Sequence, residues 1–268
     1  MKSVKILVSM VVLICLMFIG CSLKTIKPIA HGEKIGVVLM HGKGSDTQWI
    51  DPLKSSLEKA GVQVIAPKMP WHKSRIYDKS FDDAMAEINS HVKDLKQKGA
   101  AKVFVAGHSM GAIAAAGYAG RFDDIQGIIL LAPGHFTAWP AFHNRFVDDL
   151  TKADEMINAG KGDEKGEFND LNAGKTFTRF VTANIYKSWF SDSGPAEFTA
   201  NMANIKGHIP VLYIAGSQDR IPQTKNKDYA FVKAPSNPES HFVIIESGHL
   251  DVPERADEIV INWLRHQI

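Results

Sequence analysis

The chain has 268 residues, of which 45% are hydrophobic and 22% are charged. This composition is that of a globular protein, which excludes intrinsic disorder and fibrous architectures, and the length allows a sizeable core. Lysine and arginine number 31 against 29 acidic residues, and the sequence contains no basic run, so nucleic acid is not an expected partner. Only Cys15 and Cys21 are cysteines, which excludes a disulfide framework and a cysteine–histidine zinc site.

Residues 1–20 have the pattern of a signal peptide. Lys2 and Lys5 form a basic start, and residues 6–20 carry no charge. Such an uncharged run is too short for a comfortable transmembrane helix and is typical of the apolar part of a secretion signal. The following sequence, Phe-Ile-Gly-Cys-Ser over residues 18–22, resembles the lipobox of bacterial lipoproteins, although phenylalanine stands where leucine is more common.

This resemblance implies that Cys21 is the lipidation site and the first residue of the mature chain, with residues 21–34 as a lipidated tether. More than one acyl chain would anchor the protein stably, because each buried CH₂ contributes ~0.8 kcal/mol. Ser22 is similar to the pattern that permits export to the outer membrane. We therefore expect a bacterial cell-envelope protein, lipid-anchored at the outer membrane and facing the periplasm. A plain cleaved signal and an uncleaved anchor are the alternatives.

Apolar runs of strand length alternate with helical patterns in the rest of the chain. Strands are predicted at 35–40, 62–66, 102–106, 127–132, 211–215 and 242–246, and helices at 47–60, 81–98, 109–121 and 254–266. This alternation predicts a doubly wound, mostly parallel α/β sheet of about six strands with helices on both faces. Residues 134–208 contain helical patterns without a convincing strand, so we expect a helical cap inserted between two strands.

The motif Gly-His-Ser-Met-Gly at residues 107–111 lies between the predicted strand 102–106 and a helix rich in alanine and glycine. A serine in this strand–turn–helix setting occupies a strained turn that places its hydroxyl above the sheet. The flanking glycines avoid collisions that a Cβ atom would cause across the turn. Ser109 is therefore the candidate nucleophile.

A serine hydroxyl needs a base, and an acid should orient that base. Asp219 follows the predicted strand 211–215, and His249 follows the predicted strand 242–246. The chain order of serine, aspartate and histidine is that of a nucleophile-elbow enzyme. We predict that His249 takes the Ser109 proton through Nε2 and that Asp219 accepts the Nδ1–H of His249.

The developing oxyanion needs two hydrogen-bond donors. We assign one to the backbone N–H of Met110, which follows the nucleophile, and the other to the backbone N–H of Lys43. Lys43 lies in the loop His-Gly-Lys-Gly at residues 41–44, after the first predicted strand, and the glycines let this loop approach the substrate carbonyl.

These motifs together resemble the α/β-hydrolase superfamily. The matching segments are HGKG at 41–44, GHSMG at 107–111, GSQDRIP at 216–222 and SGH at 247–249. The resemblance covers about residues 35–268 and implies a serine-hydrolase triad that uses no metal and no cofactor. The short segment between Cys21 and the first strand implies that the first two strands of the family are missing, which leaves a sheet of six.

The expected activity is cleavage of carboxylic esters through an acyl-enzyme, of the carboxylesterase or lysophospholipase-like kind. A small ester or lipid-like substrate suits a membrane-anchored protein with an aromatic-rich cap. Thioesterase and peptidase activity stay open because they share the tetrahedral intermediate, and an acyltransferase would differ only in the group that accepts the acyl chain. A non-catalytic envelope lipoprotein is the alternative from a different class.

Overall fold

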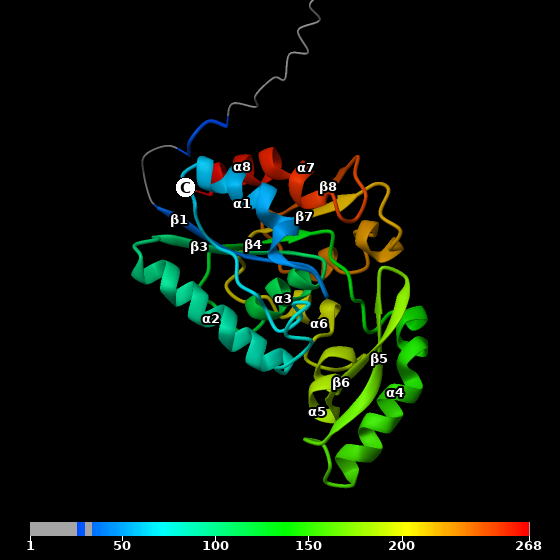
Figure 1. The fold of residues 1–268 in the computed structure, drawn as a ribbon. Helices are drawn as coiled ribbons and strands as arrows, with labels where there is room; N and C mark the ends of the chain where they lie inside the picture. Colours follow the sequence, from blue (N-terminus) through cyan, green and yellow to red (C-terminus); the bar gives the residue numbers. More distant parts are fainter. Residues whose placement is uncertain (1–25, 30–33, 268) are drawn as a thin grey trace, which may run out of the picture.

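The computed structural model describes residues 26–29 and 34–267 and is organised around one parallel sheet (Figure 1). The strands are β1 (Ile35–Met40), β2 (Gln63–Ile65), β3 (Lys102–His108), β4 (Gly127–Leu131), β7 (Val211–Gly216) and β8 (His241–Ile245). Their order across the sheet is β2-β1-β3-β4-β7-β8, and every neighbouring pair is parallel. The predicted six-stranded, doubly wound α/β fold is confirmed. The predicted signal peptide and Cys21 lie outside the described residues.

Helices cover both faces of the sheet (Figure 1). One face carries α1 (Asp51–Lys59), α7 (Val252–Arg255) and α8 (Asp257–His266), and the other carries α2 (Phe81–Gln97) and α3 (Met110–Ala119). Side chains of β1 point alternately to the two faces of the sheet. Val37 and Leu39 pack in the hydrophobic cluster on the side of α1 and α8, whereas Val38 and Met40 pack in the cluster on the side of α2 and α3. This double burial explains why the strands are continuous apolar runs.

The residues between β4 and β7 form the cap, most of which lies beyond one end of the sheet (Figure 1). It consists of α4 (Pro140–Asn158), β5 (Lys165–Asn172), β6 (Lys175–Thr182), α5 (Ala183–Phe190) and α6 (Phe198–Ala203). The expectation of a cap without strands was wrong, because β5 and β6 pair as an antiparallel hairpin. Ala173 and Gly174 form its two-residue turn, and both have positive φ angles of 49° and 78°, as a tight hairpin turn requires.

The cap hairpin escaped prediction because most of its side chains face solvent. Among the residues of β5, only Phe168 and Asp170 are buried, so no apolar run or regular apolar alternation marks this strand. The alternating threonines and phenylalanines of β6 were the available signal. The hairpin is therefore only weakly marked in the sequence.

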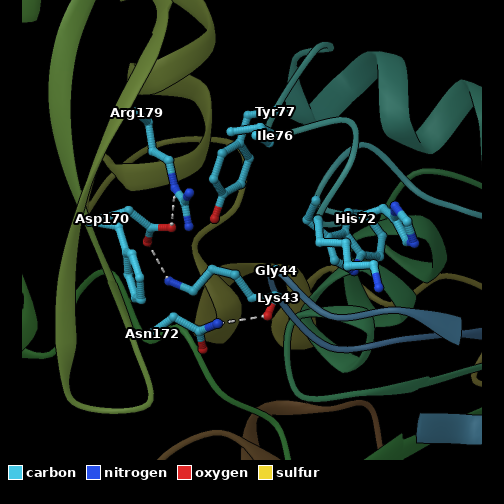
Figure 2. Close-up of a pocket in the computed structure, with 11 residues that line it drawn as sticks. Lys43, Gly44, His72, Ile76, Tyr77, Asp170, Asn172 and Arg179 are labelled. Carbon is cyan, nitrogen blue, oxygen red and sulfur yellow. Dashed lines mark hydrogen bonds and ion pairs between the residues drawn. The ribbon is translucent and has the colours of Figure 1, made fainter. Parts of the chain in front are cut away.

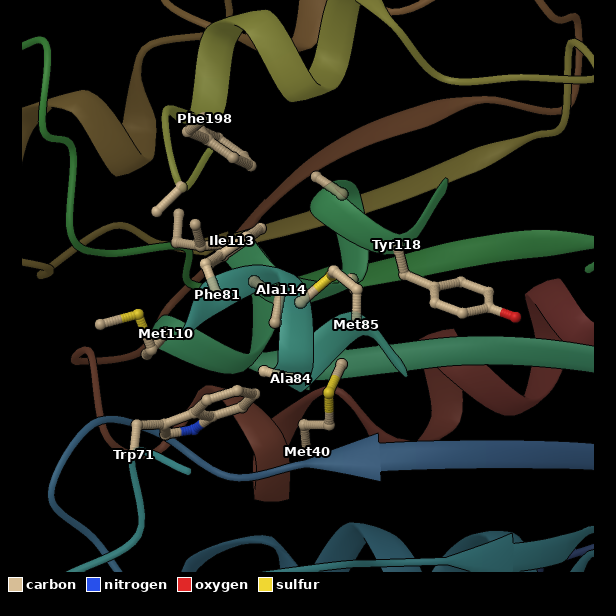
Figure 3. Close-up of a cluster of buried hydrophobic side chains, with 14 of the residues drawn as sticks. Met40, Trp71, Phe81, Ala84, Met85, Met110, Ile113, Ala114, Tyr118 and Phe198 are labelled. Carbon is tan, nitrogen blue, oxygen red and sulfur yellow. The ribbon is translucent and has the colours of Figure 1, made fainter. Parts of the chain in front are cut away.

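Aromatic side chains of the cap mainly form its own core. Tyr186 stacks on Phe168 and on Phe190, with ring centroids 4.5 Å and 4.4 Å apart. Trp189 packs edge-on against Phe81 of α2 at 5.0 Å, which joins the cap core to the main hydrophobic cluster. Figure 3 shows part of that cluster, which includes Phe81, Trp71 and the small α3 residue Ala114. In the described part of the chain, no helix is long and apolar enough to span a membrane.

Candidate active site

Ser109 lies at the sharp turn between β3 and α3, as predicted. Its backbone adopts φ 55° and ψ −113°, a conformation that L residues rarely adopt and that persists only where the surroundings enforce it. A Cβ at Gly107 would lie 2.1 Å from the carbonyl oxygen of Gly111, and a Cβ at Gly111 would lie 2.7 Å from the Met40 carbonyl oxygen of β1. Both glycines are therefore required for α3 to begin this close to the sheet.

The three predicted triad side chains form one hydrogen-bonded chain. The distance from Ser109 Oγ to His249 Nε2 is 3.0 Å, and the distance from His249 Nδ1 to Asp219 Oδ2 is 2.6 Å. Because the Asp219 carboxylate accepts hydrogen bonds, Nδ1 of His249 carries the hydrogen and Nε2 presents its lone pair to the serine. The other carboxylate oxygen of Asp219 accepts from the Ile221 backbone N–H at 2.9 Å, and Asp219 is buried.

Both predicted oxyanion donors lie on segments that touch Ser109. Met110 is the first residue of α3, so no preceding turn of that helix supplies a carbonyl for its backbone N–H. Lys43 follows Gly42, where a Cβ would lie 3.4 Å from the Cβ of Ser109. The loop after β1 therefore passes directly beside the nucleophile, as the prediction requires.

Gly134, which was not among the predicted site residues, also borders the serine. A Cβ at this position would lie 3.0 Å from Ser109 Oγ and 3.4 Å from His249 Cε1. A side chain here would occupy the space where a substrate carbonyl must approach the hydroxyl. Gly134 lies three residues after the end of β4, and the only sequence signal was a glycine just beyond the carboxyl end of a central strand, where ligands bind in such sheets.

The side chain of Lys43, for which the sequence suggested no role, fastens the loop after β1 to the cap hairpin. Its Nζ donates to Asp170 Oδ1 at 2.7 Å and lies 3.3 Å from His135 Nδ1. Asn172 Nδ2 donates to the Lys43 carbonyl oxygen at 3.0 Å. Burial raises the pKa of Asp170, but the adjacent Lys43 ammonium outweighs it, so the pKa lies below its usual value. The hairpin therefore holds the segment that carries a predicted oxyanion donor.

The loops around the site are braced by buried hydrogen bonds. His108 Nε2–H donates to the His249 carbonyl oxygen at 2.9 Å, and Trp71 Nε1–H donates to the His41 carbonyl oxygen at 2.7 Å. His41 Nε2 accepts from the Met69 backbone N–H at 3.2 Å, so this histidine supports its loop. Within the described residues, no cluster of histidine, cysteine, aspartate and glutamate side chains could hold a metal ion.

A family model described as serine aminopeptidase, S33 (Hydrolase_4) matches residues 33–250. The chain belongs to this hydrolase family. Comparison of this hydrolase with curated protein sequences gave no match.

Solved structures with the same fold include several lipolytic enzymes. A monoacylglycerol lipase from Paleococcus ferrophilus has 22% identity and a TM-score of 0.61, with 90% of this chain and 96% of that chain covered. A structure reported for the metagenome-derived lipolytic enzymes LipS and LipT has 19% identity and a TM-score of 0.59, covering 89% and 96%. Est1E from Butyrivibrio proteoclasticus, with bound ferulic acid, has 16% identity and a TM-score of 0.58, covering 90% and 92%. These likenesses show the α/β-hydrolase fold.

The buried histidines near the site predict that the hydrolase loses stability in mild acid. Burial lowers the pKa of His41 to about 4 and the pKa values of His108 and His135 to about 3. Between the unfolded pKa of ~6.5 and these folded values, the unfolded chain binds protons that the native state does not, so the free energy of unfolding falls as pH falls. Urea unfolding between about pH 7 and pH 5 should show this decline. The slope of the unfolding free energy against pH should approach the value for an unfolded chain that binds about three more protons than the native state.

His135→Gln should reduce that slope by about one proton, because it removes one of the three groups that the native state keeps neutral. An unfolding free energy that stays constant across this pH range would contradict the proposed burial of neutral imidazoles.

Proposed function

We propose that the protein is a serine hydrolase that cleaves carboxylic esters through an acyl-enzyme, with Ser109 as the nucleophile. The observation that carries this proposal is the hydrogen-bonded chain from Ser109 through His249 to Asp219, because it joins residues 140 positions apart in an order suited to proton transfer. The strained turn at Ser109 supports the same role, because such backbone strain is concentrated at functional sites.

The geometry supports a two-stage reaction. Ser109 Oγ attacks the ester carbonyl carbon while its proton passes to His249 Nε2, and Asp219 stabilises the resulting imidazolium. The backbone N–H groups of Lys43 and Met110 donate to the oxyanion, and His249 returns the proton to the alcohol oxygen as the carbon–oxygen bond breaks. A water molecule then gives a proton to His249 and attacks the acyl group, which releases the carboxylic acid and restores Ser109.

Ester cleavage is favoured over aminopeptidase activity because the acidic side chain beside the site is already paired with cations. A free carboxylate is the strongest hydrogen-bonding partner for the ammonium group of an aminopeptidase substrate. Asp170 is the acidic side chain that lines the pocket next to the loop 41–44, and both of its oxygens already bind cations, Lys43 and Arg179. The names of the structural relatives, a monoacylglycerol lipase and lipolytic enzymes, are consistent with an ester or lipid-like substrate.

Ser109→Ala should abolish hydrolysis of p-nitrophenyl esters, with a fall in kcat of at least ~10³-fold, because no other group supplies the attacking oxygen. A chain-length panel of these esters, run beside aminoacyl p-nitroanilides, measures the activity and separates esterase from aminopeptidase. Ser193→Ala is the matched control because Ser193 is an exposed serine of the cap. A folded Ser109→Ala variant that retains more than a few per cent of esterase activity would count against the proposal.

We further propose that the protein is anchored in the bacterial cell envelope through a lipid on Cys21, at the outer membrane and facing the periplasm. The lipobox-like sequence at 18–22 supports this proposal. The described part of the tether packs on the domain, where the backbone N–H of Ile29 donates to the Ala60 carbonyl oxygen at 2.9 Å. An anchor at Cys21 would therefore leave the domain a few residues from its lipid.

Metabolic labelling with radioactive palmitate in a Gram-negative host tests the anchor. Wild type and Cys15→Ala, the control within the predicted leader, should incorporate label and sediment with membranes, whereas Cys21→Ala should do neither because it lacks the acylated thiol. Label retained by Cys21→Ala would refute lipidation at this residue.

A further inference from the structure

A pocket of about 190 Å³ opens beside the candidate active site, between the cap hairpin and the loops that follow β1 and β2. Its walls include Asp170 and Arg179 from the hairpin, Lys43 and Gly44 from the loop after β1, and Tyr77 from the segment before α2 (Figure 2). None of the three triad side chains lines it. It is therefore a separate feature that adjoins the site.

With Lys43, Arg179 and Asp170 all ionised, the pocket carries one positive charge in excess; burial lowers the pKa of Lys43, and the adjacent Asp170 carboxylate opposes that shift. Asp170 binds two cations, with Lys43 Nζ 2.7 Å from Oδ1 and Arg179 Nε 3.3 Å from Oδ2. The other lysine on the wall, Lys73, is paired with Asp46 at 2.7 Å, so that pair adds no net charge.

The excess charge comes with unused hydrogen-bond donors. Within the described residues, Arg179 bonds through Nε only, and its two terminal Nη atoms have no hydrogen-bond acceptor. A guanidinium with both Nη groups free presents the fork that matches a carboxylate or a phosphate.

Tyr77 supplies a second unused donor. Its residue is only 4% exposed, and its hydroxyl forms no hydrogen bond of ordinary geometry among the described residues, although the Asp170 carboxylate lies close enough to add to the rise in its pKa. Figure 2 shows this hydroxyl pointing into the space between Lys43 and Arg179. Burial raises the pKa of Tyr77 well above its usual value, so the hydroxyl stays a donor at neutral pH. A buried donor without an acceptor is destabilising, and an oxyanion in the pocket would satisfy it.

The backbone that presents Tyr77 is itself strained. Ile76 and Tyr77 have φ angles of 50° and 55°, and both residues line the pocket. Consecutive β-branched and aromatic residues rarely adopt this left-handed conformation, and strain of this kind accumulates at ligand-binding sites.

The pocket shares the loop after β1 with the candidate active site. Lys43 lines it with its side chain, while the backbone N–H of Lys43 is the proposed oxyanion donor. Gly44 is also on the wall, and its Cα lies at most ~7.6 Å from that of Gly42, which borders Ser109. An ester that extends from Ser109 along this loop would therefore reach the pocket.

We propose that this pocket binds an anionic group, a carboxylate or a phosphate, carried by the ester substrate, with the Nη atoms of Arg179 and the hydroxyl of Tyr77 as its hydrogen-bond donors. The proposal rests on the esterase function proposed above and narrows it to esters that bear a negative charge near the scissile bond. Asp170 does not repel such a group strongly, because Lys43 and Arg179 already neutralise its charge.

Calorimetric titration with inorganic phosphate tests the pocket without requiring catalysis. We expect Tyr77→Phe and Arg179→Met each to raise the dissociation constant for phosphate at least ~10-fold, the loss expected for a hydrogen bond to a charged group. Tyr77→Phe is the decisive variant because it leaves no partner unpaired, whereas Arg179→Met deprives Asp170 of a cation. Lys175→Met is the matched control, since it removes an exposed charge from the same strand but not from the pocket. Equal phosphate binding by all variants, or none by wild type, would overturn the proposal.

Two ester pairs test whether the anion belongs to the substrate. Mono-p-nitrophenyl adipate is compared with p-nitrophenyl hexanoate for a charge on the acyl side, and para-butyryloxybenzoate with its methyl ester for a charge on the alcohol side. In at least one pair, wild type and Lys175→Met should prefer the charged ester in kcat/KM, and this preference should fall at least ~10-fold in Tyr77→Phe.

The two experiments separate the possible failures. Phosphate binding without preference in either ester pair would identify a site for a free anion and overturn the substrate assignment. If no ester of either charge were hydrolysed, the proposed function would fall and the ester part of this proposal with it, while the titration would still decide whether the pocket binds anions.

Discussion

The close approach of α3 to the sheet at two glycines is the constraint on which the rest of the site depends. Any Cβ at Gly107 or Gly111 would collide with backbone atoms, so the helix can begin here only if both residues are glycine. This approach forces Ser109 into its positive-φ conformation and places its hydroxyl against His249. Met110, the first residue of α3, follows the serine directly, and its N–H has no carbonyl partner within the helix. One packing requirement thereby positions the candidate nucleophile and a candidate oxyanion donor together.

The cap also makes polar contacts with the loop after β1. Through Asp170 and Asn172, its hairpin bonds both the side chain and the carbonyl group of Lys43. The loop beside the nucleophile is therefore fastened to the cap, and a movement of the hairpin would shift the Lys43 backbone. The same hairpin presents Arg179 to the adjoining pocket. Positioning of the reacting carbonyl and selection of a charged substrate group are thus proposed to share one structural element.

Most of the fold and the three triad side chains could be predicted from sequence, for one physical reason. Strands buried on both faces are continuous apolar runs, and the carboxyl ends of parallel strands meet at one edge, so Ser109, Asp219 and His249 had to converge. The hairpin could not be predicted in this way, because its exposed strands carry little apolar pattern. The partners of Lys43 and the pocket around Tyr77 were hidden for the same reason, since they exist only once the hairpin packs on the loop after β1.

Peptide mapping by mass spectrometry after reaction with a fluorophosphonate tests the central claim most directly, because this reagent traps a serine whose proton is removed by a neighbouring base. The account predicts one adduct per chain, on the peptide that contains Ser109, and a strongly reduced yield in His249→Ala. An unmodified Ser109 in folded protein, or an adduct that forms equally well without His249, would contradict it.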